Sequence, residues 1–253
     1  MNVLKDIYYT NEIDEHKALD VYIPSGECKA VFLYIHGGGI EKGNKRNFFR
    51  EAEFLEKYGY GSVSIEYPLY PNTKFPDFLY TTAEAVAWTK RNMRKFFNCD
   101  TLYIGGDSAG GYISMMLCFD PRYLASVGLS NNDIAGYWHA AGQPTAHFNV
   151  LKYSGVDPRR VIVDERAPLY FIGLEEKYPY MRFTVSDNDM FARYEQTMLV
   201  LKTLEHFGYK NYDHKVVSGT HCEFFKKLFE DGTSEVSHLL LDFLETAEKY
   251  NNT

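Results

Sequence analysis

Ser108 lies in a sequence pattern that could supply a nucleophile. Residues 106–110 read Gly-Asp-Ser-Ala-Gly, which fits the G-x-S-x-G nucleophile elbow, a tight turn between a strand and a helix. The apolar run 101–104 before the motif predicts a buried strand, and the run 112–118 after it, which contains no helix breaker, predicts a helix. The two glycines let the strand and helix approach each other closely. We therefore expect the Ser108 hydroxyl to project from the end of a strand, with a helix N-terminus behind it.

A glycine-rich loop upstream could stabilise negative charge on a reacting group. The apolar run 30–35 predicts a second buried strand, which leads directly into His36 and three consecutive glycines. Glycines leave their backbone N–H groups uncovered, and an oxyanion hole needs such donors where charge develops. Loops of this kind act together with the N–H of the residue after the nucleophile, here Ala109. We expect donors from the loop Gly37–Gly39 and from Ala109, with His36 supporting the loop.

An acid and a base follow the serine in the order serine, acid, histidine. The run 181–185 predicts a strand, and Asp187 and Asp189 come just after it, at the edge where open α/β sheets bind ligands. Asp189 is the stronger candidate because it opens a segment that leads into a helix, whereas Asp187 is still close to the strand. His221 lies in a loop after the predicted strand 212–217.

These residue types predict acyl transfer. His221 would take the proton of Ser108 as the hydroxyl attacks a carbonyl, and Asp189 would hold the imidazole in the right tautomer. Water would then hydrolyse the acyl-enzyme. His139 and His147, in a region that the sequence predicts poorly, are the rival bases. The remaining histidines apart from His36 are expected at the surface: His16, His206, His214 and His238.

The elements that would position these residues alternate between strand and helix, which predicts a mostly parallel sheet with helices on both faces. Further predicted strands are 5–10 and 17–23, as an antiparallel pair, and 61–66 and 134–138. Predicted helices are 47–58, 77–93, a helix that buries Tyr194, Met198, Leu201 and Leu204, and 234–250. The segment Glu223–Phe229 is expected to be amphipathic. Segments 119–133 and 143–180 fit no simple element, and we expect a cap or pocket wall within 119–180.

Length and composition predict one α/β domain over residues 1–253. The formal net charge of −7 argues against nucleic acid or an anionic membrane as partner. The N-terminus has no apolar signal region, so we expect a cytoplasmic protein. The four cysteines have neither metal-ligand nor disulfide spacing. Cys118 is expected in the core, and Cys222, beside His221, is expected to have a packing role rather than a role at the site. The sequence leaves the oligomeric state open, with a homodimer compatible with it.

The chain resembles the α/β-hydrolase superfamily and, within it, the hormone-sensitive-lipase-like esterases. The resemblance rests on His-Gly-Gly-Gly at 36–39, Gly-Asp-Ser-Ala-Gly-Gly at 106–111, the Tyr-x-Leu-x-Pro-x-x-x-Phe-Pro run at 67–76 and the segment 19–24. It implies an α/β-hydrolase fold with a small cap insertion and a carboxylesterase for short acyl chains. It also implies Ser108, Asp189 and His221 as the triad, N–H donors from Gly38, Gly39 and Ala109, and no metal or organic cofactor.

Two departures from the family pattern bear on the substrate. Pro68 stands where members usually carry Arg, and the first strand begins without a long helical cap. An open site would suit a small ester with a bulky alcohol, such as a decorated sugar or a plant polysaccharide fragment. Two other hypotheses about function remain. The chain could be an amidase, peptidase or arylformamidase on the same fold, or a non-catalytic binding protein on a hydrolase scaffold.

Overall fold

The chain folds around one eight-stranded sheet, and the computed structural model describes residues 1–251. The strands lie in the order β1-β2-β4-β3-β5-β6-β7-β8. The β1–β2 and β2–β4 pairs are antiparallel, and all other neighbours are parallel. The strands are β1 (Asn2–Tyr8), β2 (Ala18–Ile23), β3 (Ala30–Ile35), β4 (Tyr60–Ile65), β5 (Leu102–Asp107), β6 (Gly136–Ala140), β7 (Tyr180–Asn188) and β8 (Tyr212–Thr220).

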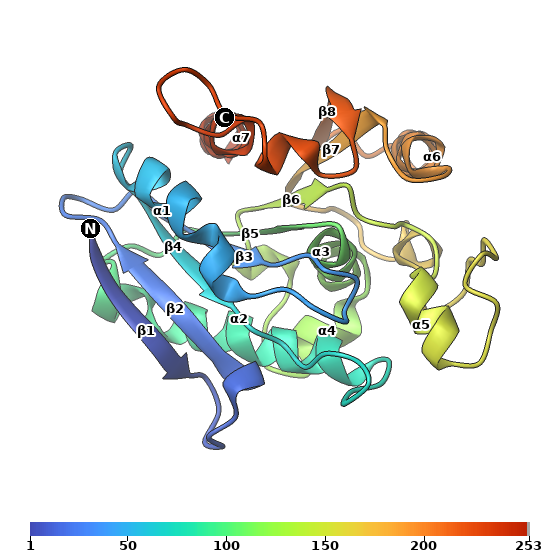
Figure 1. Ribbon diagram of the computed structural model, residues 1–253, viewed down its shortest axis with the longest axis horizontal. Helices are drawn as coiled ribbons and strands as arrows, with labels where there is room; N and C mark the ends of the chain where they lie inside the picture. The colour runs from blue at the N-terminus through green and yellow to red at the C-terminus, as the bar shows by residue number, and fades with distance from the viewer. Residues whose placement is uncertain (252–253) are drawn as a thin grey trace.

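Helices cover both faces of this sheet. The α-helices are α1 (Phe49–Glu56), α2 (Asp77–Phe96), α3 (Ala109–Phe119), α4 (Pro121–Ala125), α5 (Phe148–Tyr153), α6 (Arg193–His206) and α7 (Glu235–Asn251). Single 3₁₀ turns are η1 (Glu15–Lys17), η2 (Lys45–Phe48), η3 (Asn131–Asp133), η4 (Pro168–Phe171) and η5 (Glu223–Phe225). Residues of α1 and α7 share one apolar core, and those of α2, α3, α4 and α6 share the other. Figure 1 shows α1 and α7 on one side of the sheet and α2 and α4 on the other.

The central strands are buried on both faces, which explains their sequence. Every residue of β3 and β4 is buried, as expected of parallel strands covered by helices, which read as continuous rather than alternating apolar runs. The edge strand β8 is mostly exposed. The carboxyl ends of β3, β5, β7 and β8 share one edge of the sheet, and the loops that follow them carry all the predicted site residues.

The predicted architecture is confirmed, with shifts at element ends. The strand at 30–35 and the antiparallel N-terminal pair are present. The helix after Ser108 begins at Ala109 rather than 112. Within the predicted cap region 119–180, β6 is a central strand, so the irregular part before β7 is residues 141–179, which hold α5 and η4. No helix in the described range is long and apolar enough to cross a membrane.

Two local predictions were wrong. The predicted amphipathic segment Glu223–Phe229 is only the single turn η5, and Phe229 is half exposed because the chain turns back there to pair Leu228 with Ser234. Tyr194 lies on α6 but is 36% exposed. The buried stripe of this helix starts instead at Arg193, which is only 3% exposed.

Candidate active site

Ser108 occupies a strained turn between β5 and α3. Its backbone angles are φ 52° and ψ −111°, a left-handed φ that costs a non-glycine residue roughly 1–3 kcal/mol. Gly106 and Gly110 permit this turn, because a Cβ at either position would overlap the carbonyl oxygen of Ile35 on β3. The sharp turn places the Ser108 side chain at the carboxyl end of the sheet, as the motif requires.

The structure brings Ser108, His221 and Asp189 into one hydrogen-bonded chain. His221 Nε2 lies 2.8 Å from Ser108 Oγ, and His221 Nδ1 lies 2.5 Å from Asp189 Oδ1. The three residues follow β5, β8 and β7, so they meet only because these strands end at the same edge. A serine next to a histidine that is oriented by a buried carboxylate is the arrangement of an activated nucleophile.

The electrostatics of Asp189 suit a role beside a histidine. Its side chain is fully buried, and it also accepts the Met190 N–H at 2.7 Å. Burial disfavours the ionised carboxylate, but the hydrogen bond and charge of His221 outweigh it and hold the pKa of Asp189 below its usual range. The carboxylate therefore stays ionised and keeps the proton of the imidazole on Nδ1.

The rival residues have other partners. Asp187 is exposed and accepts the Gly219 N–H at 2.9 Å, which ties β7 to β8. His139 is buried with Nδ1 2.8 Å from Ser114 Oγ, and His147 accepts the Asn149 N–H at the start of α5. Burial lowers the pKa of both histidines to about 3. In the described part of the chain, neither histidine is hydrogen-bonded to Ser108.

The predicted oxyanion donors lie in the loop after β3 and at the start of α3. Gly38 and Gly39 have φ angles of +113° and +69°, which favour glycine. Within residues 1–251, no hydrogen-bond acceptor is found for the N–H groups of Gly38, Gly39 or Ala109. The N–H of Ala109 is also one of the free donors at a helix N-terminus. These three groups are therefore available to an anion.

Gly37 does not share this role, contrary to the expectation that the whole glycine loop supplies donors. Its N–H is donated to Asp107 Oδ1 at 3.1 Å, and the same oxygen accepts the Tyr34 hydroxyl at 2.5 Å. Burial raises the pKa of Asp107, although both hydrogen bonds and the nearby His36 favour its charged form. Asp107, the variable residue before the nucleophile, thus connects the serine turn to the glycine loop.

His36 connects the glycine loop to the residues that follow β4. Its ring is buried, with Nε2 3.1 Å from Glu66 Oε2 and Nδ1 2.7 Å from the Gly37 carbonyl oxygen. It stacks on Tyr67, whose hydroxyl donates to the His36 carbonyl at 2.8 Å. Glu66 and Tyr67 directly follow β4, so the strand next to β3 holds the loop in place.

A contact from α5 holds the other end of the glycine loop. Asn149 Nδ2 donates to the Gly39 carbonyl oxygen at 2.7 Å. Because this bond engages the carbonyl, it leaves the Gly39 N–H free while restraining the peptide. The region that the sequence predicted as a cap or pocket wall therefore touches the candidate oxyanion loop.

Two further observations concern side chains that could act as a nucleophile or as metal ligands. Cys222 has its Sγ 3.7 Å from His221 Nε2, and burial raises the pKa of its thiol well above the usual range, so it is a poor nucleophile. Across residues 1–251, no cluster of three or more His, Cys, Asp or Glu side chains could hold a metal ion.

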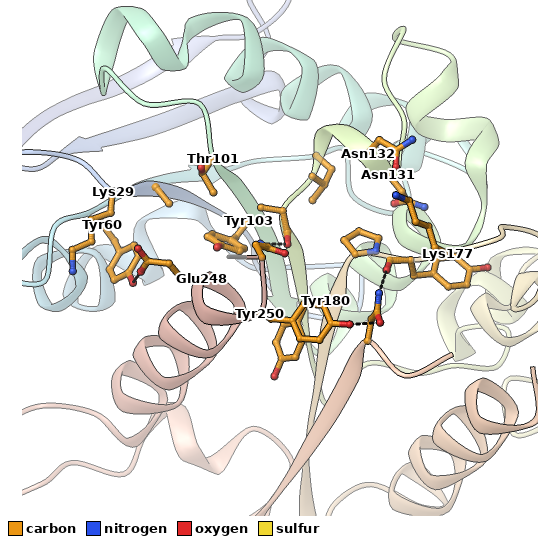
Figure 2. Close-up of a pocket in the computed structure, with 17 residues that line it drawn as sticks. Lys29, Tyr60, Thr101, Tyr103, Asn131, Asn132, Lys177, Tyr180, Glu248 and Tyr250 are labelled. Carbon is orange, nitrogen blue, oxygen red and sulfur yellow. Dashed lines mark hydrogen bonds between the residues drawn. The ribbon is translucent and has the colours of Figure 1, made fainter. Parts of the chain in front are cut away.

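A pocket of about 480 Å³ lies at the opposite edge of the sheet, where the parallel strands begin. Figure 2 shows the residues that line it. Tyr60, Tyr103, Tyr180 and Lys177 are among its lining residues. No histidine, serine or cysteine lines it within the described chain. It offers no nucleophile paired with a base, so the candidate active site is the one around Ser108.

Comparisons of sequence find esterases. The BD-FAE family model matches residues 19–141. An acetyl esterase of Salmonella schwarzengrund is 27% identical over 97 residues, which are 38% of this chain and 30% of the relative. A probable carboxylic ester hydrolase, LipM, of Mycobacterium tuberculosis is 32% identical over 98 residues, 37% of this chain and 23% of the relative. The chain thus spans less than a third of the length of these curated relatives.

Comparisons of structure extend over nearly the whole chain. Esterase B from Lactobacillus rhamnosis has a TM-score of 0.81 at 18% identity, covering 99% of this chain and 88% of that one. A truncated carbohydrate esterase from gut microbiota has a TM-score of 0.78 at 15% identity, covering 98% and 97%. The Est2 esterase of Thermogutta terrifontis with butyrate bound has a TM-score of 0.75 at 16% identity, covering 96% and 93%. With its mostly parallel sheet covered on both faces, this chain has the α/β-hydrolase fold.

Proposed function

We propose that the chain is a serine carboxylic ester hydrolase that acts on esters of short acyl groups. One observation carries the proposal: His221 Nε2 lies 2.8 Å from Ser108 Oγ while its Nδ1 lies 2.5 Å from the buried Asp189. The free N–H groups of Gly38, Gly39 and Ala109 support it. Acetyl esterases and carboxylic ester hydrolases among the relatives agree with this reaction class.

The first half of the reaction forms an acyl-enzyme. Ser108 Oγ bonds to the carbonyl carbon while its proton passes to His221 Nε2, and Asp189 stabilises the imidazolium. The carbonyl oxygen becomes an oxyanion held by the three backbone donors. The bond from carbon to the alcohol oxygen then breaks, and the alcohol leaves with the proton from His221. Losing one oxyanion donor typically lowers turnover by about 10²–10³-fold.

The second half releases the acid. A water gives its proton to His221 Nε2 as its oxygen attacks the acyl carbon, and the same donors hold the second oxyanion. The bond from carbon to Ser108 Oγ breaks, and Ser108 recovers its proton from His221. The products are the alcohol and the carboxylic acid, and the chain's own groups supply each proton transfer.

The alcohol part of the substrate belongs to the same proposal at a finer level. An acetylated sugar or a plant-derived ester is consistent with the carbohydrate esterase among the structural relatives. Acetylated xylo-oligosaccharides compared with simple acetate esters test this point. Equal kcat/KM for the two groups would remove the sugar from the proposal.

The test of the reaction is hydrolysis of 4-nitrophenyl acetate, butyrate and octanoate by the wild type and by Ser108→Ala. The proposal expects turnover that is fastest on the acetate and is lost in Ser108→Ala. Cleavage of acyl anilides with no cleavage of esters would instead favour an amide hydrolase. A folded protein that hydrolyses neither would favour a binding role.

A further inference from the structure

A pocket of about 540 Å³ lies beside the candidate active site, between α5 and the start of α6. Phe148 forms part of its wall, and the ring reaches towards Gly39 of the glycine loop. Met190 and Phe191 form another part, directly after Asp189. The pocket therefore adjoins both the oxyanion loop and the acid, close to the atoms that would hold an ester.

The apolar residues of this pocket are unusually open to solvent. Phe191 is 93% exposed and Val161 is 60% exposed. A concave surface lined by large apolar side chains is more often a ligand site than the rest of a protein surface is. Aromatic rings such as Phe148 and Phe191 favour a flat, apolar group against them.

The charges in the pocket all have one sign. Arg159, Arg160 and Arg193 line it, and its described lining contains no Asp or Glu. This contrasts with the chain as a whole, which has 34 acidic residues against 27 Lys and Arg. A positive pocket in a protein of negative net charge is selective for an anion, because the rest of the surface repels it.

Arg193 provides the buried part of this charge. It is 3% exposed, and its guanidinium donates to the Ala141 carbonyl oxygen and to Gln143 Oε1. No carboxylate of residues 1–251 lies within ion-pair distance of it. Burial disfavours the charge of Arg193, and the Asp189 carboxylate, which favours that charge from beyond ion-pair distance, is already hydrogen-bonded to His221. An anion in the pocket would supply a closer counter-charge.

The other two arginines differ in how far they are already neutralised. Arg159 donates to both oxygens of Asp157, at 3.0 and 2.7 Å. Arg160 is exposed; its charge acts on the nearby Asp157 carboxylate, but none of the described carboxylates forms an ion pair with it. Arg160 at the rim and Arg193 within the pocket are thus the cations left for a ligand.

We propose that this pocket is a subsite for a carboxylate-bearing aromatic group of the ester substrate. The carboxylate would lie between Arg160 and Arg193, and the ring against Phe148 and Phe191. The inference rests on the proposed esterase function. The group belongs either to the alcohol side of a short-chain ester or to the acyl side of a second class of ester, and the experiment below separates the two.

The test compares esters that differ only in a carboxylate and its neutral carboxamide. For the alcohol side, the pair is 4-acetoxybenzoate and 4-acetoxybenzamide. For the acyl side, it is the mono-4-nitrophenyl ester of terephthalic acid and 4-nitrophenyl 4-carbamoylbenzoate. We expect the wild type to prefer the carboxylate in one pair, and Arg160→Gln to lower that kcat/KM ratio by about three- to tenfold. Intrinsic reactivity cancels in the comparison of the variants.

The matched control is Arg91→Gln, which removes the same charge from an exposed site on α2. It should leave the ratio at the wild-type value. The subsite would be overturned if this kcat/KM ratio were equal in wild type and Arg160→Gln, or if the wild type preferred the carboxylate in neither pair. Turnover of 4-nitrophenyl acetate would still support the esterase function in that case.

Binding tests the pocket without turnover. In an NMR titration of Ser108→Ala, 4-acetamidobenzoate should bind more tightly than 4-acetamidobenzamide, and Arg160→Gln should remove the difference. Equal binding of the two compounds would reject the subsite, whatever the outcome of the activity assay. If 4-nitrophenyl acetate is not hydrolysed by the wild type, the proposed function fails, and this titration alone decides the pocket.

Discussion

At the scale of single residues, the three aspartates close to the candidate site have different hydrogen-bond partners. Asp189 binds His221, Asp187 binds the Gly219 backbone, and Asp107 binds the Gly37 N–H. Three aspartates near one serine thus have three different surroundings. Their surroundings, rather than their residue type, predict which of them affects turnover.

The two candidate acids give a direct comparison. Asp189→Asn should lower kcat for 4-nitrophenyl acetate by about 10³–10⁴-fold, because the amide favours the wrong imidazole tautomer. Asp187→Asn should stay within about threefold of wild type, because an amide oxygen still accepts the Gly219 N–H. Steady-state kinetics of the two folded variants measure this. A larger loss of kcat in Asp187→Asn than in Asp189→Asn would show that Asp187, and not Asp189, is the catalytic acid.

Glu66 predicts a pH-dependent contribution to stability. Burial opposes its ionisation, but hydrogen bonds and charge from His36 and Lys45 outweigh it and place its pKa below the ordinary 4.5. A carboxylate with a lowered folded-state pKa stabilises the fold above its unfolded-state pKa and loses this contribution as the pH falls. Glu66→Gln should therefore be less stable at pH 7, by about 1–3 kcal/mol.

The difference in the free energy of unfolding between wild type and Glu66→Gln should decrease as the pH falls below about 4.5. Urea unfolding at pH 7, 5 and 3.5 gives both free energies of unfolding. A gap that stays constant or widens towards low pH would contradict the ionised Glu66 beside His36.

At the scale of elements, the nucleophile turn depends on how closely β3, β5 and α3 approach. Gly110 lies in the first turn of α3, against the backbone of Ile35. The side chain of Asn149 on α5 and the ring of His36 then restrain the glycine loop from two sides. The site is therefore built on rigid strand ends and on contacts between elements that are distant in sequence.

Gly110→Ala tests this close packing. The added Cβ would overlap a backbone oxygen that cannot rotate away, so we expect a loss of about 3 kcal/mol in the free energy of unfolding. Gly26→Ala is the matched control, because no atom lies within 4 Å of the added Cβ. Thermal unfolding of both variants measures the difference. Equal melting temperatures would show that the turn has more room than described.

The sequence predicted the elements that have a regular pattern and missed the contacts that have none. Continuous apolar runs identified β3 and β4, and glycine motifs identified the loop and the serine turn. Apolar periodicity misplaced Tyr194, because the buried stripe of α6 begins with a charged residue, Arg193. Nothing local marks Glu66 as the partner of His36, although its position after a buried strand could have suggested it.

At the scale of the whole molecule, the candidate site needs both halves of the sheet. The family match ends at residue 141, after the glycine loop and Ser108 but before Asp189 and His221. The two halves meet where β6 pairs with β7, and the Trp138 indole donates to Thr184 Oγ1 at 3.0 Å across this boundary. The second half therefore supplies the candidate acid and base, Asp189 and His221, and its strand β7 pairs with β6.

A fragment of residues 1–141 should have no esterase activity. It lacks the base and acid, and it leaves β6 as an unpaired edge, which favours aggregation. Hydrolysis of 4-nitrophenyl acetate and sedimentation of the fragment, each compared with the full chain, test this. A soluble fragment with activity near that of the full chain would contradict the three-residue site.

Contacts between residues that are distant in sequence leave no local sequence pattern. The sulfurs of Cys28 and Cys99, for example, lie 3.6 Å apart although the two residues are 71 positions apart in the chain.

The most direct test of the account is covalent labelling with a fluorophosphonate, followed by peptide mapping. Such a probe reacts with a serine that a neighbouring base has activated. We predict one adduct per chain, on Ser108, that disappears in Ser108→Ala and forms far more slowly in His221→Asn. No adduct on the folded wild type, or an adduct on a different residue, would contradict the assignment of Ser108 as the nucleophile.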